Sequence, residues 1–492
     1  MKQLLGIDIG TSACKVAVFD TDGKVLAQAN EPYQVYYPNS GWAEQDADEW
    51  WEAIVKATKT VLAADGVSAD EICGIGVDGQ SWSAIPVNEA GEALDRTPIW
   101  MDTRARDICE RVKAEVGEDE IFKVAGNDFL PSYTTPKMLW FKEQKPEVFE
   151  KTYKFLQSNS YIVLKLTGKM SQDLSQGYGI HFFNMESLSY DEDMANKLGL
   201  SVDLVPDLYK CDEVVGKVTA EAAKITGLKE GTPVVAGGLD AASGTLGAGV
   251  YKEGQTQEQG GQAGGMSICT PKALAHKKLI LSAHVVPGQY LLQGGSVGGG
   301  GALKWFRQEF GKDLSFDDLT KEAEATTAGA DGVTFLPYMS GERSPIWDPD
   351  AKGVFYGLSF DKTRGHMIRA VLEGVAYSLE HNMRTAAETG VTVNEMNAMG
   401  GSANSVLWTQ IKADVTGKTF KVPASDTAST WGAALLAGVG TGVYKDYEEA
   451  VEKTIKIVRV QEPDMKKHEM YKKCMDLYLE LYEKLKGTFA KY

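Results

Sequence analysis

The sequence predicts an α/β protein made of two domains that meet at a cleft, and three observations support this prediction. The chain has 492 residues, which is too long for a single hydrophobic core. Strand-like and helix-like segments alternate in a similar order in both halves, as in domains that carry a mixed sheet between helices. A glycine-rich stretch at residues 237–265 lies between the halves, where small residues suit a cleft and a hinge.

The first half opens with strands and then alternates. The predicted elements are a hairpin at 3–20, a strand at 24–30, an amphipathic helix at 46–64 and a strand at 72–78. The hairpin turns at Gly10-Thr11-Ser12, and Asp46 or Asp48 precedes the helix as its N-cap. The last of these strands ends in the polar tip Asp78-Gly79-Gln80.

The second half repeats this organisation without repeating the sequence. The predicted elements are strands within 255–270 and at 289–294, a helix at 363–389, a strand at 396–399, and helices at 402–416 and 463–492. We therefore predict an N-terminal domain over residues 1–250 and a C-terminal domain over residues 251–492.

Composition and charge exclude several classes of protein. Hydrophobic residues make up 43% of the chain and charged residues 24%, which is ordinary for a globular protein. The formal net charge of −17 disfavours nucleic acid and anionic membranes as partners. Apolar stretches fall short of the roughly 18 residues of a membrane span. Asp8 interrupts the short apolar N-terminus, which argues against a signal peptide.

Cysteine and histidine usage points to a reducing compartment. Six cysteines and six histidines are scattered along the chain without a CxxC pair or an HExxH motif. A metal site built from these two residue types is not expected, and neither is a disulfide framework at this length. We therefore expect a cytoplasmic protein.

The first chemical motif is the hairpin around Asp8. An aspartate at a strand tip followed by Gly10-Thr11-Ser12 can bring backbone N–H groups and hydroxyls against a phosphate. The Asp8 carboxylate can hold Mg²⁺, through water, and Lys15 adds positive charge on the return strand. The alternative interpretation is an ordinary hairpin with an exposed aspartate.

A second aspartate follows an apolar strand at residues 234–236. Gly237-Gly238 and Leu239 lead to Asp240, and small residues follow it in a helix-like segment. The open approach and the helix N-terminus suit a general base that takes a proton from a hydroxyl. The alternative is an aspartate that only caps the helix.

Three glycine-rich segments follow downstream. They are residues 260–265, 294–301 and 400–404. None fits the dinucleotide fingerprint or the P-loop pattern. Gly400-Gly401 would permit flat contact with a planar ring, and Asn404 could hydrogen-bond a base or ribose. Glycine that serves only tight turns is the alternative for each segment.

Taken together, the motifs resemble the FGGY family of carbohydrate kinases, in the family's order and across residues 6 to 404. The segments are 8–12 with Lys15 and 238–249 (phosphate motifs), 133–140 (YTTPKMLW) and 335–345 (FLPYMSGERSP) (signatures), and 399–404 (MGGSAN, adenosine motif). Within the family, the chain most resembles the xylulokinase branch, through residues 42–46 (WAEQD), 100–104 (WMDTR) and PKMLW.

The resemblance implies two actin-like, ribonuclease-H-like domains around a deep cleft. The first domain would bind the sugar and the second the nucleotide. The implied reaction transfers the γ-phosphoryl group of ATP, with Mg²⁺, to a sugar hydroxyl. The xylulokinase branch implies D-xylulose as substrate and D-xylulose 5-phosphate as product. By analogy alone, the family suggests a homodimer.

The resemblance also assigns roles to individual residues. Asp240 falls on the family's catalytic base, and Asp8 on the second catalytic carboxylate, which is associated with the metal. The expected sugar contacts are Gln80, Ser81, Trp82, Asp102, Arg104 and Asp240. The expected phosphate and nucleotide contacts are Thr11, Ser12, Lys15, Gly261, Gln262, Gly299, Gly400, Gly401 and Asn404.

Some positions depart from the family's pattern and keep alternatives open. Trp82 replaces the usual histidine of xylulokinases, Ala241 follows the catalytic aspartate in place of Asn or Gln, and Gln262-Ala263 replace hydroxyl residues. The alternatives are a kinase for another ketose, a polyol or a sugar acid, and a degenerate kinase that senses sugar. An actin-like or chaperone-type ATPase is a further alternative, against which the 335–345 signature and the tryptophans of the first domain argue.

Overall fold

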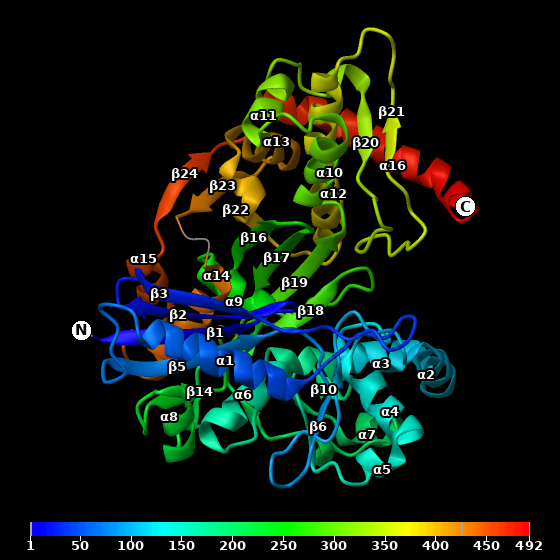
Figure 1. The fold of residues 1–492 in the computed structure, drawn as a ribbon. Helices are drawn as coiled ribbons and strands as arrows, with labels where there is room; N and C mark the ends of the chain where they lie inside the picture. The colour runs from blue at the N-terminus through cyan, green and yellow to red at the C-terminus, as the bar shows by residue number, and fades with distance from the viewer. Residues whose placement is uncertain (1, 425–426, 492) are drawn as a thin grey trace.

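The structure is a computed structural model that describes residues 2–424 and 427–491. It has two lobes, each built on a seven-stranded mixed sheet. Figure 1 shows the two sheets facing each other, with helices α9 (Asp240–Gly247) and α14 (Ala428–Gly440) between them. The two predicted α/β units are thus confirmed. The boundary predicted after residue 250 stays a prediction.

The sheet of the first lobe has the order β13-β14-β5-β1-β2-β3, with β15 paired beside β5. Strands β1, β2 and β3 are antiparallel, whereas β5, β14 and β15 run parallel to β1. The strands are β1 (Gln3–Ile9), β2 (Ala13–Asp20), β3 (Val25–Pro32), β5 (Ile72–Gly79), β13 (Val214–Lys217), β14 (Pro233–Val235) and β15 (Gly238–Leu239).

Both faces of this sheet are covered by helices. Successive side chains of β1 point to opposite faces, and all residues of β1 are buried. Leu5, Ile7 and Ile9 join the core beneath α1 (Ala47–Leu62). Helices α6 (Ser158–Thr167) and α8 (Ala220–Thr226) lie on the same side as α1. Asp46 is the N-cap of α1 and accepts a hydrogen bond from the N–H of Asp48 at 3.0 Å, as one of the two predicted caps.

Helix α14 covers the other face, although it comes from late in the chain. It packs against β1, β5 and α9. A methyl group on Gly6 would lie 1.9 Å from the carbonyl oxygen of Thr430, and one on Gly76 would lie 1.8 Å from that of Ala433. The missing side chains of these two glycines therefore let α14 lie directly on the strands. Helix α15 (Tyr447–Thr454) follows on the same lobe.

The segment between β5 and β13 extends the first lobe (cyan, lower right in Figure 1). Besides α6, its helices are α2 (Arg106–Val112), α3 (Glu118–Ala125), α4 (Thr134–Gln144), α5 (Pro146–Phe149) and α7 (Glu192–Lys197). Its short strands pair as β6 (Ile85–Val87) with β8 (Lys154–Leu156), β9 (Gln172–Asp173) with β12 (Leu208–Tyr209), and β10 (Phe183–Asn184) with β11 (Ser189–Tyr190). Its strand β7 (Thr97–Pro98) pairs with β4 (Glu44–Gln45), which precedes α1.

The second lobe repeats the arrangement of the first, with the strand order β18-β19-β17-β16-β22-β23-β24. As in the first lobe, an antiparallel run is followed by parallel neighbours, here β16, β22 and β23. The strands are β16 (Gly254–Gly260), β17 (Gly264–Thr270), β18 (Ile280–Ala283), β19 (Tyr290–Ser296), β22 (Val393–Met399), β23 (Thr419–Pro423) and β24 (Ile457–Gln461).

Three helices of the second lobe match the predicted segments closely: α12 (Arg364–Ala387), α13 (Val406–Thr416) and α16 (Met465–Phe489). Helices α10 (Gly300–Phe310) and α11 (Phe316–Glu324) and the strand pair β20 (Thr334–Leu336) and β21 (Val354–Tyr356) were not predicted. Among the described residues, no helix combines the length and the apolar character needed to cross a membrane.

Candidate active site

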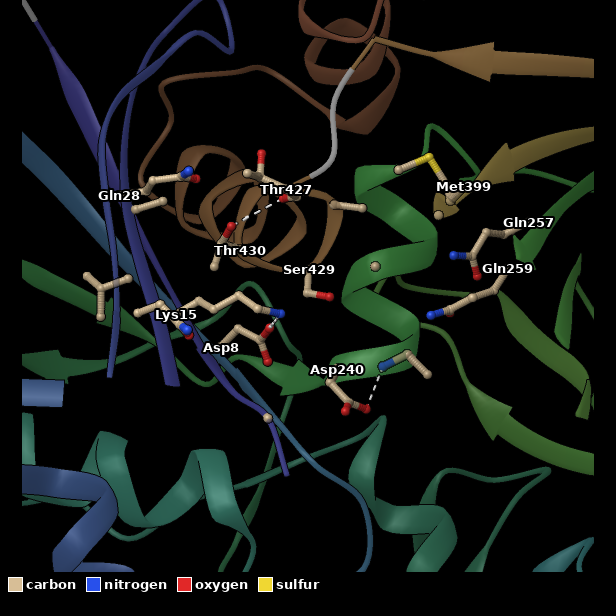
Figure 2. A pocket seen from close by; sticks show the side chains of 18 of the residues that line it. Asp8, Lys15, Gln28, Asp240, Gln257, Gln259, Met399, Thr427, Ser429 and Thr430 are labelled. Atoms are coloured by element: carbon tan, nitrogen blue, oxygen red, sulfur yellow. Dashed lines mark hydrogen bonds and ion pairs between the residues drawn. The ribbon is translucent and has the colours of Figure 1, made fainter. Parts of the chain in front are cut away.

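A cleft of about 860 Å³ lies between the lobes, and Figure 2 shows it from close by. Its wall is built from the β1–β2 hairpin and β3 on one side, and from α9, β16 and the turn after β22 on the other. The N-terminus of α14 closes a third side. The lining residues include Asp8, Lys15, Gln28, Asp240, Ala241, Gln257, Gln259, Met399, Gly400, Gly401, Asn404, Thr427, Ser429 and Thr430.

Asp8 and Lys15 face each other across the first hairpin. They are opposite residues of the β1–β2 pair, and the Lys15 ammonium lies 3.2 Å from an Asp8 carboxylate oxygen. The Lys15 side chain is 61% exposed, whereas Asp8 is 5% exposed. Asp8 raises the pKa of Lys15, so this lysine stays charged beside the cleft.

Asp240 is the first residue of α9 and lies below Asp8 and Lys15 in Figure 2. Its Oδ1 accepts a hydrogen bond from the N–H of Ala241 at 2.6 Å. Burial, and then the charge of Asp8, raise the pKa of Asp240 to about 7, while the Ala241 N–H and Lys15 act in the opposite direction. A carboxylate with a pKa near neutral pH is suited to general base catalysis.

A third carboxylate, Asp78, lies between these two and was not among the candidate site residues. It is the second-last residue of β5, level with Asp8 on one neighbouring strand and with Gly238 on the other. Asp78 is fully buried, and neither carboxylate oxygen has a hydrogen-bond partner. Burial, followed by the charges of Asp8 and Asp240, raises the pKa of Asp78 well above its usual range. Its place at the tip of a strand parallel to β1 was the available signal.

The predicted nucleotide residues fall into two places. Gly400, Gly401 and Asn404 line the cleft in the turn after β22. Gly261, Gln262 and Gly299 lie together near the start of α10. The carbonyl of Gly261 accepts a hydrogen bond from the N–H of Gly300 at 2.7 Å, and the carbonyl of Gln262 accepts one from the N–H of Gly301 at 2.9 Å. Gly299 packs against Ala263 and Gly264. None of these three predicted residues is among those that line the cleft, and their contacts with the nucleotide stay predictions.

Thr11 and Ser12 form the tip of the first hairpin and are not among the residues that line the cleft. The Thr11 hydroxyl accepts a hydrogen bond from the indole N–H of Trp100 at 2.9 Å. The Thr11 carbonyl accepts another from Gln45 at 2.8 Å. The hairpin is therefore tied to the loops that carry the predicted sugar contacts.

Gln80, Ser81 and Trp82 follow Asp78 after a single glycine, Gly79. Gln80 is buried and donates to the side chain of Gln45 at 2.7 Å, and the Ser81 hydroxyl accepts from Tyr178 at 2.7 Å. Trp82 has a left-handed backbone with φ of 61°. Its ring stacks on Tyr133 at 4.1 Å between centroids, and its buried indole N–H has no partner. Gln80, Ser81 and Trp82 are not among the residues that line the cleft, and their sugar contacts stay predictions.

Asp102 and Arg104 lie further out and bind each other. Asp102 is fully buried, and its carboxylate accepts from the N–H of Ala43 at 2.7 Å and from the Arg104 guanidinium at 3.0 Å. Arg104 also pairs with Glu44 at 2.8 Å and lies over the Trp42 ring at 3.8 Å. The Asp102 carboxylate and the Nε and Nη2 groups of Arg104 are thus engaged within the protein, and a direct sugar contact by either residue stays a prediction.

Comparison with known proteins decides the family. The domain models described as "FGGY family of carbohydrate kinases", N-terminal and C-terminal, match residues 3–247 and 266–441. The chain belongs to the FGGY family of carbohydrate kinases. The two-lobed fold is accordingly the actin-like fold that was expected. As a member, this protein is a sugar phosphotransferase that uses ATP as its phosphate donor.

Relatives of this kinase cover its whole length. It is 31% identical over 484 residues to a xylulose kinase of Bacillus subtilis, a match that covers 98% of this chain and 97% of the relative. The crystal structure of xylulose kinase from Rhodospirillum rubrum superposes with a TM-score of 0.93 at 29% identity, over 100% of both chains. That of gluconate kinase from Lactobacillus acidophilus gives 0.91 at 26% identity, over 100% of this chain and 99% of the other.

The N-terminus of α14 forms a wall of the kinase's cleft that was not predicted from the sequence. Helix α14 begins at the cleft, and Ser429 and Thr430 line it beside Lys15 (Figure 2). A helix N-terminus carries partial positive charge and free N–H groups, so it favours an anion such as a phosphate. A run of small hydroxyl residues before the apolar helix was the only signal in the sequence.

Magnesium fits the oxygen donors of this kinase. No group of three or more His, Cys, Asp or Glu side chains in residues 2–424 and 427–491 is placed to hold a metal ion by itself. Mg²⁺ needs only one or two carboxylates when phosphate oxygens supply other ligands. Asp8, with the unpartnered carboxylate of Asp78 beside it, offers such a donor set.

Proposed function

We propose that this kinase phosphorylates D-xylulose with ATP and produces D-xylulose 5-phosphate. The observation that carries the chemistry is Asp240, a half-buried carboxylate with a pKa of about 7 that lines the cleft between the two lobes. The observation that favours the sugar is the full-length likeness to xylulose kinases of Bacillus subtilis and Rhodospirillum rubrum.

In the proposed reaction, Asp240 accepts the proton of the sugar hydroxyl as the hydroxyl oxygen bonds to the γ-phosphorus. The bond between the γ-phosphorus and the bridging oxygen of ATP breaks, and ADP leaves. Lys15 and the N-terminus of α14 are the positive groups that would face the phosphates. Mg²⁺, held by Asp8, would neutralise further phosphate charge.

The predicted roles of the remaining residues form part of the proposal. Gly400, Gly401 and Asn404 lie where they could contact the nucleotide from the second lobe. Trp82, with its unpartnered indole N–H, is the strongest candidate for a sugar contact in the first lobe. Closure of the lobes would exclude water, which competes with the sugar as phosphoryl acceptor.

A sugar acid is the second candidate substrate, because the gluconate kinase of Lactobacillus acidophilus has nearly the same fold. An acid would require a cation close to the sugar. Arg104, the cation among the expected sugar contacts, is engaged with Asp102 and Glu44. This engagement favours a neutral ketose.

The test is an ADP-release assay with Mg-ATP against ketoses, polyols, aldoses and sugar acids. Strong turnover with D-xylulose supports the proposal, and preferential turnover with gluconate replaces it with the second candidate. Sugar binding without sugar-stimulated ADP release would instead indicate a sensor. The cytoplasmic location and the homodimer remain predictions, and light scattering of the purified kinase checks the second.

A further inference from the structure

The second lobe contains a buried ion pair that the proposed mechanism does not use. The Lys412 ammonium lies 2.6 Å from a carboxylate oxygen of Glu258, and their side chains are 1% and 4% exposed. The same ammonium donates to the Ser402 hydroxyl at 2.7 Å. The second carboxylate oxygen of Glu258 has no partner. None of the three residues is among those that line the cleft.

The three residues come from three elements behind the nucleotide side of the cleft. Glu258 lies in β16, level with Ala398 of the parallel strand β22. Ser402 belongs to the turn that follows β22, in the 3-10 segment Gly401–Asn404. Lys412 lies in α13. The ion pair and the Lys412–Ser402 hydrogen bond therefore connect two glycine-rich turns. One turn follows β16, and the other contains Gly400, Gly401 and Asn404.

Close packing makes these turns depend on one another. A methyl group on Gly260 would lie 1.6 Å from the Ser402 hydroxyl oxygen, and one on Gly400 would lie 2.9 Å from the carbonyl carbon of Gly260. The next residue, Gly261, accepts a backbone hydrogen bond from Gly300 at the start of α10. Through these contacts the position of Ser402 is coupled to all three glycine-rich segments.

The Glu258–Lys412 ion pair is poorly explained as a source of folding stability. The cost of removing two charges from water largely offsets their attraction, and apolar replacements of buried ion pairs are often neutral or stabilising. A role in fixing the geometry of the neighbouring turn explains the pair better. The Lys412 ammonium donates to both Glu258 and Ser402. Because Glu258 holds the ammonium in place, the second hydrogen bond fixes the Ser402 side chain and, with it, the turn that reaches the cleft.

We propose that Lys412, anchored by Glu258, is a positioning residue that holds the turn of residues 400–404 in the conformation that binds the nucleotide. This inference rests on the proposed nucleotide role of that turn. It predicts that loss of the Lys412–Ser402 contact weakens the binding of ADP and ATP and leaves the binding of the sugar unchanged.

The experiment compares two variants with the wild type. Ser402→Ala removes only the hydroxyl that Lys412 holds, and the double variant Glu258→Met/Lys412→Met removes the pair without leaving an unpaired buried charge. Calorimetry measures the affinity for ADP, which requires no knowledge of the sugar. We expect about tenfold weaker ADP binding in Ser402→Ala, because a hydrogen bond to a charged group is lost, and a larger loss in the double variant. Lys412→Arg, which keeps a positive charge beside Glu258, should retain more of the ADP affinity than the double variant does.

A matched control is available in the same lobe. The Tyr338 hydroxyl donates to the Tyr478 hydroxyl at 2.8 Å, and both side chains are buried away from the 400–404 turn. Tyr478→Phe, which also removes one buried hydroxyl, should change the melting temperature without changing ADP affinity. Unchanged ADP affinity in folded Ser402→Ala and double variants would overturn the inference. That outcome is separate from a failure of the proposed substrate, which would appear as absent turnover with D-xylulose in the wild-type kinase.

Discussion

The pH dependence of the reaction tests the assignment of Asp240 as the base. A general base acts in its ionised form, and the pKa of Asp240 is raised to about 7 by burial and by Asp8. The rate should therefore fall as the pH decreases through 7 and the carboxylate takes up a proton. A single group of this pKa is about 9% ionised at pH 6 and about 91% ionised at pH 8, so kcat/KM for the sugar should rise about tenfold over that range.

The assay measures initial rates of ADP formation at saturating Mg-ATP between pH 5 and 9, with the amount of coupling enzyme doubled as a check. Lys15 lowers the pKa of Asp240, so Lys15→Met should move the acid limb of the profile to higher pH. Asp240→Asn should reduce the rate by about 10²–10⁴-fold and abolish the acid limb. A wild-type profile that stays flat down to pH 5 would refute the reasoning, since no base with a pKa near 7 would then control the rate.

Three further predictions concern stability and specificity. Asp78 is buried without partners and its pKa is raised by burial, so folding above pH 4 requires either a buried charge or the uptake of a proton. Asp78→Asn should therefore raise the free energy of unfolding at pH 7.5 by about 1–3 kcal/mol, and the gain should shrink towards pH 4 in urea titrations. An equal gain at both pH values would contradict this. Gly76→Ala would place a methyl group 1.8 Å from the Ala433 carbonyl oxygen and should cost about 1–3 kcal/mol or more. An unchanged urea midpoint would argue against close packing of α14 on β5. Trp82→His removes a ring that stacks on Tyr133, and we expect the KM for the sugar to change about tenfold while the KM for ATP stays within about twofold of the wild type. Equal changes in both constants would mean that Trp82 acts on the fold and not on the sugar.

Local patterns in the sequence were sufficient to predict several of the longer elements of each lobe, but not α2–α8, α10, α11, α14 or α15. The β1–β2 hairpin, α1 with its Asp46 cap and α12 all have alternation or 3.6-residue periodicity that depends only on neighbouring residues. Asp8 and Asp240 were identified for a similar reason, because each stands at the tip of an apolar strand before small residues. Their meeting in one cleft then follows from the parallel pairing of β1, β5 and β15.

Features that depend on distant contacts were not accessible in the same way. Arg104 was expected to contact the sugar, but its pairing with Asp102 and Glu44 becomes apparent only when the loops meet. Asp78 was visible as a polar strand tip, yet its lack of partners depends on burial by elements from elsewhere in the chain. The cleft position of α14 depends on the close approach allowed by Gly6 and Gly76, more than 350 residues earlier in the sequence.

The return of α14 to the first lobe has a consequence for how the chain is made. During synthesis, β1 and β5 leave the ribosome long before the helix that covers them, because α14 ends at Gly440. Until then, the sheet face that carries Gly6 and Gly76 has no permanent cover. The first lobe can therefore be completed only after most of the second lobe has been synthesised. A nascent chain that stops near residue 250 would present this face to chaperones, and the finished kinase would hide it.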